Sequence, residues 1–251
     1  MGLRIFLAGE VEVLAGERLL RQERFPGLQG RIVFAMLAAE HRRAVSRDEL
    51  GEELWGSAPP TAPETGIRAL VSKLRSVLAD AGLGDALASA FGAYQLRLPP
   101  DAWVDLEAAA DAIHRAEPAL RDGNLPDAVG FGRVAATISG RPLLVGAEGP
   151  WIVHRRESLN DIRLRALECL AEAWLRRGDP AQAARDALLA VSVDPFREPS
   201  HRLLMQGLAR GGDRAGALKA YERLRSSLDD ELGTRPSPET EHVYLEILRT
   251  G

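Results

Sequence analysis

The first twenty residues alternate between apolar and polar positions, and this period of two is typical of half-buried β-strands. The apolar positions are Leu3, Ile5, Leu7, Val11, Val13 and Leu19. Two pairs of small residues, Ala8-Gly9 and Ala15-Gly16, separate them as turn signals. The pattern predicts a small antiparallel sheet at the start of the chain.

From Arg31 the apolar residues recur at helical spacing and stop near His41, which predicts a first helix. Ser46 followed by Glu49 is a capping-box pair, and it predicts a short second helix that Gly56 ends. The side chains expected on the buried side of that helix are Leu50, Leu54 and Trp55.

A proline-rich connector, residues 58–63, precedes a strongly amphipathic segment from about Thr61 to Ala81. Its apolar positions are Ile67, Leu70, Val71, Leu74, Val77 and Leu78. Residues 91–98 then predict one or two short strands around a glycine turn, and the segment ends at Pro99-Pro100. A sheet, three helices and a hairpin, in this order, are the layout of a winged helix-turn-helix domain with a preceding sheet.

Beyond Pro100 the pattern is helical almost throughout. Asp105 is placed to cap a helix that runs to about Arg121, and Asn124-Leu125-Pro126 starts another. Near Gly149-Pro150 a long helix begins, and it is expected to reach about Arg177. The second half of the chain is therefore predicted to be α-helical.

An internal repeat follows this long helix. Residues 178–184 correspond to residues 212–218, an offset of 34, which is the tetratricopeptide period. Each unit predicts two antiparallel helices joined at Gly-Asp, where the glycine ends one helix and the aspartate caps the next. Small residues such as Ala183 and Ala217 would let the paired helices approach closely.

Segments from both halves resemble a known family of regulators. In the first half they are residues 31–55, Pro59-Pro60 and Ile67–Leu78. In the second half they are Gly140–Leu143, Trp151, Asp194–Glu198, Ala217–Tyr221, Glu231–Gly233 and Pro236–Thr240. In this order they resemble the Streptomyces antibiotic regulatory protein family, with an OmpR-type winged-helix domain over residues 1–100 and a bacterial transcriptional activator domain over residues 101–251.

The resemblance implies a transcriptional regulator, usually an activator, connected with secondary metabolism. The single cysteine, Cys169, separately indicates a reducing cytoplasm as the location. The resemblance also implies that the winged helix binds direct repeats in double-stranded promoter DNA, with a homodimer on the DNA, and that the protein helps to recruit RNA polymerase. The fold class expected is mainly α with a small antiparallel β part: a winged helix-turn-helix domain followed by a tetratricopeptide-like helical domain.

The helix at residues 61–81 is expected to provide the DNA-reading face. Its apolar stripe must face the core, which leaves Glu64, Arg68, Ser72 and Arg75 on another face. Arginine reads guanine through a bidentate pair and serine or threonine reaches base edges or phosphates. Base contacts are therefore expected from Arg68, Ser72 and Arg75, with Thr65 and Lys73 beside them and Lys73 on a phosphate. Further candidates for DNA contact, mainly to the backbone, are Arg31, Arg43, Arg47 and Arg97.

Charge limits how this face can act. Residues 1–100 carry 12 Lys and Arg and 12 Asp and Glu, while the rest carry 20 and 24, so the DNA-binding half is neutral. The expected wing is also atypical, because Ala93 separates Gly92 from Tyr94 and Arg97 is the only basic residue between Asp85 and Pro100. We therefore expect weak binding by one copy, strengthened by two copies on a direct repeat or by contact with polymerase.

Other classes of function find little support. The five histidines are scattered and Cys169 is the only cysteine, so neither a metal site, a cofactor nor a disulfide is expected. No nucleotide-binding, metalloprotease or serine-hydrolase motif indicates an enzyme. The longest uncharged stretch, residues 86–96, is shorter than the about 18 apolar residues that a membrane span needs.

Two alternatives stay open. The winged helix could serve as a packing platform in a protein-interaction or ligand-sensing module that does not bind DNA, in which case Arg68 and Arg75 would be dispensable. The chain could also be either a complete small regulator or the front of a longer one, since larger relatives append nucleotide-binding or phosphopeptide-binding domains.

Overall fold

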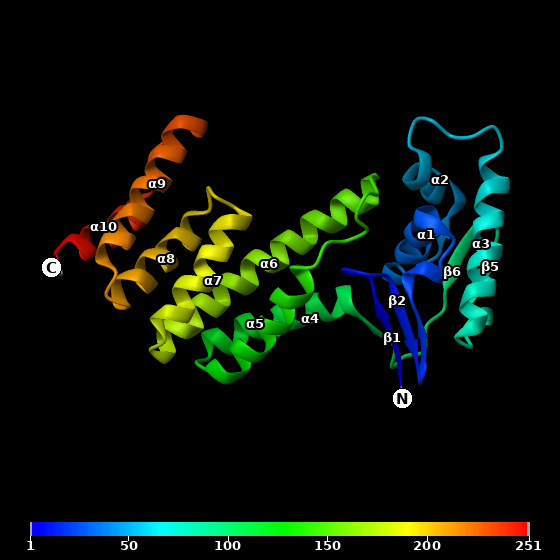
Figure 1. Ribbon diagram of the computed structural model, residues 1–251, viewed down its shortest axis with the longest axis horizontal. Helices are drawn as coiled ribbons and strands as arrows, with labels where there is room; N and C mark the ends of the chain where they lie inside the picture. The colour runs from blue at the N-terminus through cyan, green and yellow to red at the C-terminus, as the bar shows by residue number, and fades with distance from the viewer. Residues whose placement is uncertain (1, 250–251) are drawn as a thin grey trace. The chain divides into compact units, whose positions relative to one another are not determined.

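The computed structural model describes residues 2–249 (Figure 1). The chain forms two compact units, one of Met1–Ala108 with Ile138–Leu159 and one of Ala109–Thr137 with Asn160–Gly251. The units are defined by which residues pack together, so residues 138–159 belong to the same unit as the N-terminal residues. The boundary expected at Pro100 is defined by similarity to two domain families, and it stays a prediction. None of the helices within residues 2–249 combines the length and the apolar character that crossing a membrane requires.

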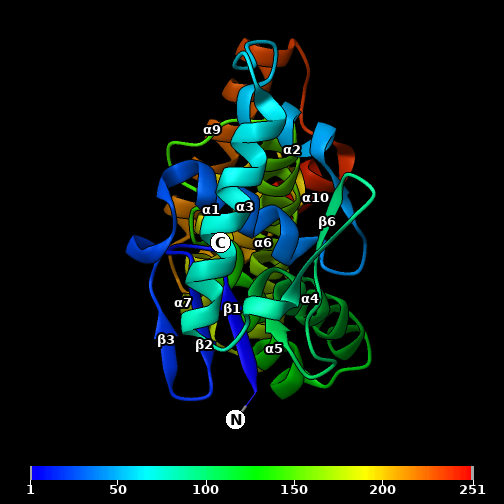
Figure 2. The same cartoon turned by 90° about the vertical axis from the view of Figure 1, so that its right-hand side faces the viewer.

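The N-terminal sheet of the first unit follows the predicted alternation. Its strands are β1 (Leu3–Phe6), β2 (Glu12–Ala15) and β3 (Arg18–Leu20), paired antiparallel, and β7 (Trp103–Val104), which adds parallel to β1. Figure 2 shows β1, β2 and β3 side by side. The antiparallel sheet is confirmed, whereas the parallel edge strand was not predicted, because two residues are too short to show a period.

Three helices and a hairpin complete the winged-helix arrangement. They are α1 (Gly27–Ala39), α2 (Arg47–Trp55), α3 (Pro63–Asp80) and the strands β5 (Leu87–Ala90) and β6 (Ala93–Leu96), with β4 (Val45–Ser46) beside β6. Two 3-10 turns, Gln22–Arg24 and Gly84–Ala86, lie between these elements. Helix α1 begins at Gly27 rather than Arg31, since its first turn contains two glycines that hide the helical pattern.

The capping box at α2 is confirmed. The Ser46 side chain accepts from the Glu49 backbone N–H, and the Glu49 carboxylate accepts from the Ser46 backbone N–H. The predicted buried side is only partly right, because Leu50 is buried while Leu54 and Trp55 are half-buried. The other buried residue of α2 is Glu53, whose carboxylate receives hydrogen bonds from backbone that is distant in sequence.

That backbone belongs to residues 138–159. Glu53 Oε2 accepts from the backbone N–H of Trp151 at 2.8 Å, and Oε1 accepts from that of Ile152 at 3.2 Å. Both N–H groups lie in the first turn of α6 (Pro150–Arg177). A Cβ on Gly149 would lie 2.4 Å from Glu53 Oε1, so glycine makes room for this carboxylate.

A second glutamate, Glu40 at the end of α1, holds the same segment. Its carboxylate accepts from the Trp151 indole N–H at 3.1 Å, from Arg43 Nε at 3.0 Å and from the Arg155 guanidinium. Burial raises the pKa of Glu40, but the hydrogen bonds from Trp151, Arg155 and Arg43 outweigh it and hold the pKa at about 2.

Asp105 also connects distant parts of the first unit. It begins α4 (Asp105–Arg121), as the sequence predicts, but its Oδ2 accepts from the backbone N–H groups of Leu7 and Ala8, each at 2.9 Å. Burial raises the pKa of the Asp105 carboxyl, and these hydrogen bonds oppose the rise. The aspartate therefore joins the end of β1 to the start of α4.

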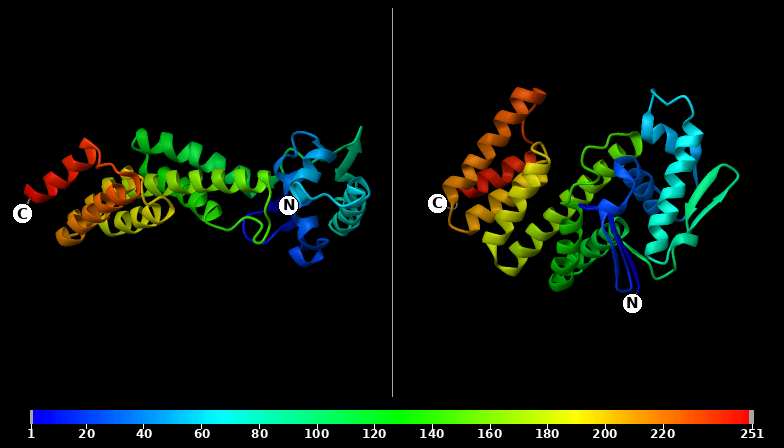
Figure 3. Two further views of the ribbon diagram at one scale, coloured as in Figure 1. Left: turned by 90° about the horizontal axis from the view of Figure 1, so that it is seen from above. Right: turned by 45° about the vertical axis from the view of Figure 1, so that its right-hand side comes forward.

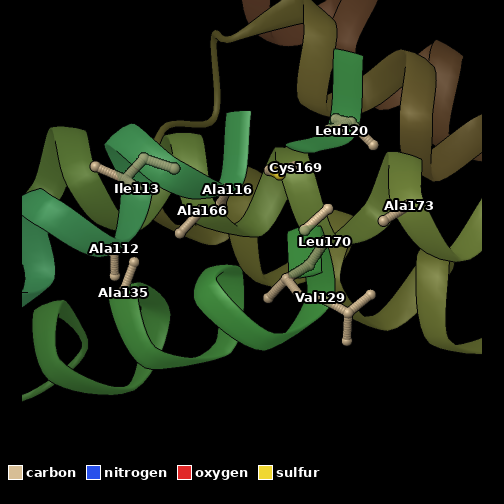
Figure 4. Close-up of a cluster of buried hydrophobic side chains, with 11 residues drawn as sticks. Ala112, Ile113, Ala116, Leu120, Val129, Ala135, Ala166, Cys169, Leu170 and Ala173 are labelled. Atoms are coloured by element: carbon tan, nitrogen blue, oxygen red, sulfur yellow. The ribbon is translucent and has the colours of Figure 1, made fainter. Parts of the chain in front are cut away.

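The second unit is entirely helical within its described residues. Besides parts of α4 and α6 it contains α5 (Leu125–Ser139), α7 (Pro180–Val193), α8 (Glu198–Arg210), α9 (Arg214–Leu232) and α10 (Pro238–Arg249). A core of small and branched side chains joins α4, α5 and α6, among them Ala116, Ala135, Cys169 and Leu170 (Figure 4). Helices α7 to α10 follow one another along the chain, yellow to red in Figure 3.

The predicted helical repeat is confirmed at both junctions. Gly178 and Gly212 adopt positive φ values of 79° and 88°, which glycine tolerates. Asp179 accepts from the Gln182 backbone N–H at 3.1 Å, and Asp213 accepts from the Gly216 backbone N–H at 2.8 Å. With the winged helix of the first unit, this confirms the expected fold class: a winged helix followed by a tetratricopeptide-like helical part.

Candidate nucleic-acid interface

Helix α3 exposes the polar face that the sequence predicts. Its apolar stripe of Ile67, Val71, Leu74 and Leu78 is buried, as the 18 residues of the helix turn one side toward the core. The exposed side chains of the opposite face are Glu64, Thr65, Arg68, Ser72, Lys73 and Ser76. Arg75, in contrast, is half-buried. Helix α3 therefore has an exposed polar face that could enter a major groove, although the Arg75 side chain of that face is half-buried.

A cleft of about 440 Å³ opens beside this face, between α3 and the β5–β6 hairpin. The residues that line it are Arg47, Arg68, Val71, Arg75, Ser89, Ala90, Phe91, Gly92, Ala93 and Tyr94. Three guanidinium groups thus meet in one depression, and none of these lining residues, all within the described chain, carries a carboxylate. Such a site suits a polyanion, because phosphate contacts are made chiefly by arginine and lysine.

Arg47 and Arg68 share one counterion on α3. Glu64 Oε2 accepts from Arg47 Nη1 at 2.6 Å and from Arg68 Nη2 at 3.0 Å. The Arg68 side chain is nevertheless 63% exposed, so solvent reaches most of the guanidinium. An exposed pair of this kind contributes little to stability, about 0 to 1 kcal/mol. Arg68 is therefore available to exchange the carboxylate for a phosphate or a base, whereas the Arg47 side chain is only 26% exposed.

Arg75 makes contacts within the first unit that its helical spacing does not suggest. Its Nε donates to the Leu87 carbonyl at 3.0 Å and its Nη2 donates to Ser89 Oγ at 3.0 Å. Both partners belong to β5, so Arg75 connects α3 to the hairpin. Helical spacing alone could not reveal this, because the partners lie in a strand that packs beside α3 only in the folded chain.

Arg47 connects the tip of the hairpin to α2. Its backbone N–H donates to the Gly92 carbonyl at 3.0 Å, and its Nε donates to the same oxygen at 3.3 Å. Gly92 has a φ of 81°, and a Cβ there would lie 3.0 Å from Arg47 Nη2. The position of the hairpin tip is thus fixed by an arginine that also lines the cleft.

The remaining candidates do not line the cleft. Arg31 donates to Gln22 Oε1 at 3.3 Å and lines a different cavity of about 320 Å³. Arg43 donates to Glu40 and to Glu49, and the hydrogen bond with Glu49 raises the pKa of Arg43, which burial alone would lower. Arg97 is exposed beyond β6. The structure brings together Arg47, Arg68 and Arg75, and leaves these three elsewhere.

Sequence reasoning missed the aromatic residues of this site. Tyr94 is buried and lines the cleft, whereas Phe91 stands at the tip of the hairpin with its side chain fully exposed. The sequence did contain a signal for Phe91. Phe91 and Gly92 form a two-residue turn between short strands, and such turns favour asparagine before the glycine. A phenylalanine at that position is therefore unusual.

Comparison with known proteins gives consistent matches over both units. The pattern that defines the bacterial transcriptional activator domain family matches residues 104–248. Regulatory protein AfsR of Streptomyces coelicolor is 34% identical over 221 residues, which are 88% of this chain and 22% of AfsR. Transcriptional regulator RedD of the same species is 32% identical over 227 residues, which are 87% of this chain and 63% of RedD.

A solved structure resembles nearly the whole length of this chain. Mycobacterium tuberculosis EmbR, solved in complex with a low affinity phosphopeptide, superposes with a TM-score of 0.86 at 25% identity. The match covers 99% of this chain and 65% of EmbR. The chain therefore spans less than a quarter of the length of AfsR. It spans slightly under two thirds of the length of RedD and of EmbR.

Proposed function

Because the chain belongs to the bacterial transcriptional activator domain family, and with it to the Streptomyces antibiotic regulatory proteins, we propose that it regulates transcription by binding specific DNA sequences. In this proposal, residues 1–100 read a promoter through α3 and residues 101–251 form the activator domain. It binds direct repeats near the promoter, acts as an activator and helps to recruit RNA polymerase.

The observation that carries this proposal is the meeting of Arg47, Arg68 and Arg75 beside the exposed face of α3. A neutral half of the chain has no global field to attract DNA, so the local arrangement of charge must do so. If Arg47, Arg68 and Lys73 neutralise about three phosphates, affinity falls about 40-fold between 50 and 200 mM salt. This modest dependence is why a second copy on the adjacent repeat is part of the proposal.

The contact with polymerase is assigned to the connector between α2 and α3. Residues 57–62 of this connector are exposed, and three prolines within residues 58–63 restrict its backbone. A stiff exposed loop presents a defined surface at low entropic cost on binding.

Fluorescence anisotropy tests the proposal. The purified chain is titrated onto labelled fragments flanking its own gene and onto shuffled duplexes, from 50 to 200 mM salt. We expect the Arg68→Ala/Lys73→Ala variant to lose about 1 to 3 kcal/mol of specific binding and to show a salt slope smaller by about one to two. Arg4→Ala removes an exposed positive charge from β1, outside the cleft, and should bind like the wild type.

Equal and weak binding to promoter and shuffled DNA, unchanged by the double substitution, would contradict the proposal. That result would favour the interaction module in which the winged helix does not bind DNA. Arg68 and Lys73 are preferred to Arg75 for this test because both are exposed, whereas loss of Arg75 also releases the hairpin from α3.

A further inference from the structure

The tip of the β5–β6 hairpin presents an aromatic side chain to solvent. Phe91 is 108% exposed, more than any other large apolar residue among the described ones. Leaving this side chain in water gives up the free energy that its burial would supply. The fold of the chain itself therefore does not explain a phenylalanine at this position.

The backbone at the tip is also unfavourable for phenylalanine. Phe91 has a φ of 49° and Gly92 has a φ of 81°, so both turn residues are in the left-handed region. A two-residue hairpin turn of this geometry favours asparagine or aspartate before glycine, and a bulky residue there is strained. Strain of this kind accumulates at functional sites, where the surrounding structure holds it in place.

The surroundings hold the tip firmly. Four residue pairs join β5 to β6, and the hydrogen bonds from Arg47 to Gly92 and from Arg75 to Leu87 and Ser89 fasten the hairpin to α2 and α3. The backbone at Phe91 is thus held in place, and Phe91 lines the same cleft as the three arginines.

We propose that Phe91 is an apolar wedge that inserts into the minor groove of the DNA duplex and partly unstacks a base step. This inference rests on the proposed function and adds how the hairpin takes part in it. In this inference α3 occupies the major groove, and the tip of the hairpin beside it enters the neighbouring minor groove. Apolar side chains inserted there kink the duplex and favour flexible steps such as TA or CA.

Charge favours DNA over an apolar protein surface as the occupant. Residues 87–96 carry no charged side chain, so no residue of the hairpin can form an ion pair with a phosphate. The cleft behind Phe91 nevertheless presents three guanidiniums and no carboxylate among its described lining residues. An aromatic ring that shares a cleft with three arginines provides partners for both the stacked bases and the phosphates of a nucleic acid.

The decisive variant is Phe91→Asn, because asparagine suits the turn better than phenylalanine. If Phe91 contacts DNA, this variant should keep or raise the melting temperature while losing about 10-fold or more in affinity for the promoter fragment. The salt slope should stay unchanged, since no charge is removed. Fluorescence transfer between labels at the duplex ends should report a bend with the wild type and a smaller bend with Phe91→Asn.

Two further variants complete the experiment. Phe91→Trp keeps a large ring and should retain affinity and bend, while Val145→Asn removes an apolar residue that is 72% exposed elsewhere in the first unit and should have no effect. Wild-type affinity and bend in Phe91→Asn would overturn the inference. So would a loss of affinity that Phe91→Trp shares, together with a lower melting temperature, because the tip would then be structural.

The outcomes also separate this inference from the proposed function. Failure of the wild type to prefer promoter DNA refutes both. Promoter binding that Phe91→Asn leaves intact refutes the wedge alone, and if polymerase-dependent transcription then falls, Phe91 contacts a protein instead.

Discussion

Glu53 is expected to be one of the most important polar residues for the stability of the first unit. It is 2% exposed, and its carboxylate faces the start of α6, where Pro150 has no N–H and Trp151 and Ile152 donate to it. The positive end of the helix dipole adds to this attraction. One side chain of α2 thereby fastens residues 138–159 to the helix-turn-helix.

The magnitude follows from these contacts. A hydrogen bond to a charged group contributes about 1.5 to 3 kcal/mol, and the helix dipole contributes about 0.5 to 1. Since Glu53→Ala removes both hydrogen bonds and leaves the buried Ile152 N–H without its acceptor, we expect a loss of about 3 to 5 kcal/mol. Glu53→Gln keeps one oxygen but turns an amide N–H toward a backbone donor, and we expect a loss of about 2 kcal/mol.

Urea unfolding followed by tryptophan fluorescence measures this effect. Three of the four tryptophans, Trp55, Trp103 and Trp151, belong to the first unit, so the signal reports mainly on it. The neighbouring Glu52 is exposed, and Glu52→Ala is the matched control. Stability within about 0.5 kcal/mol of the wild type in both Glu53 variants would refute the reasoning, since that is the range of an ordinary surface substitution.

Three further predictions concern single residues. The pKa of Glu40 is lowered from 4.5 to about 2, so its contribution of about 2 to 3 kcal/mol is complete above pH 4.5 and is lost as the pH falls toward 2. Glu49 and Glu117 also have lowered pKa values, so both proteins lose stability in acid, but unfolding curves from pH 6 to 2 should show a loss about 2 to 3 kcal/mol larger in the wild type than in Glu40→Gln. Gly207→Ala should destabilise the second unit by about 1 to 3 kcal/mol in thermal unfolding followed by circular dichroism, although alanine favours helices, because its Cβ would lie 2.8 Å from the Ala184 backbone nitrogen; an increase in stability would show that α7 and α8 can separate at no cost. Glu64→Gln removes the carboxylate that Arg47 and Arg68 share, so anisotropy should show tighter binding to promoter and shuffled DNA alike, and weaker binding to both would mean that Glu64 positions the arginines for DNA.

Periodicity and capping were enough to predict most of the fold. The alternation of residues 3–19, the Ser46 and Glu49 pair and the Gly-Asp junctions at residues 178 and 212 each specify a local structure through nearest neighbours. These local structures can therefore be predicted from short stretches of the sequence. The start of α1 was misplaced because its glycines lower helix propensity, and the start is fixed instead by tertiary contacts such as the Phe25 and Phe34 rings, whose centroids lie 4.8 Å apart.

The packing of residues 138–159 with the N-terminal unit could not be predicted in this way. Glu53 reads as a solvent-facing charge in a short helix, and nothing nearby in the sequence shows that its partners are Trp151 and Ile152. The separation of 98 and 99 residues between these partners carries no periodic signal. Similarity to a family predicts the domain boundary near Pro100. Which residues pack together is decided instead by long-range polar contacts such as those of Glu53.

The candidate site shows the same division between local and distant information. Helical spacing correctly separated the buried and exposed sides of α3 for every candidate except Arg75, whose partners lie in a strand. The neutral charge of residues 1–100 likewise concealed a concentration of arginine, because the acids that balance it lie outside the lining of the cleft and only Glu64 reaches two of the guanidiniums. The pair between Arg68 and Glu64 is exposed and weak, so a phosphate can replace the carboxylate there at small cost. A shared acid of this kind lowers affinity for all DNA equally, and it therefore leaves discrimination between sequences to the base contacts of α3 and to the deformation that the proposed wedge at Phe91 requires.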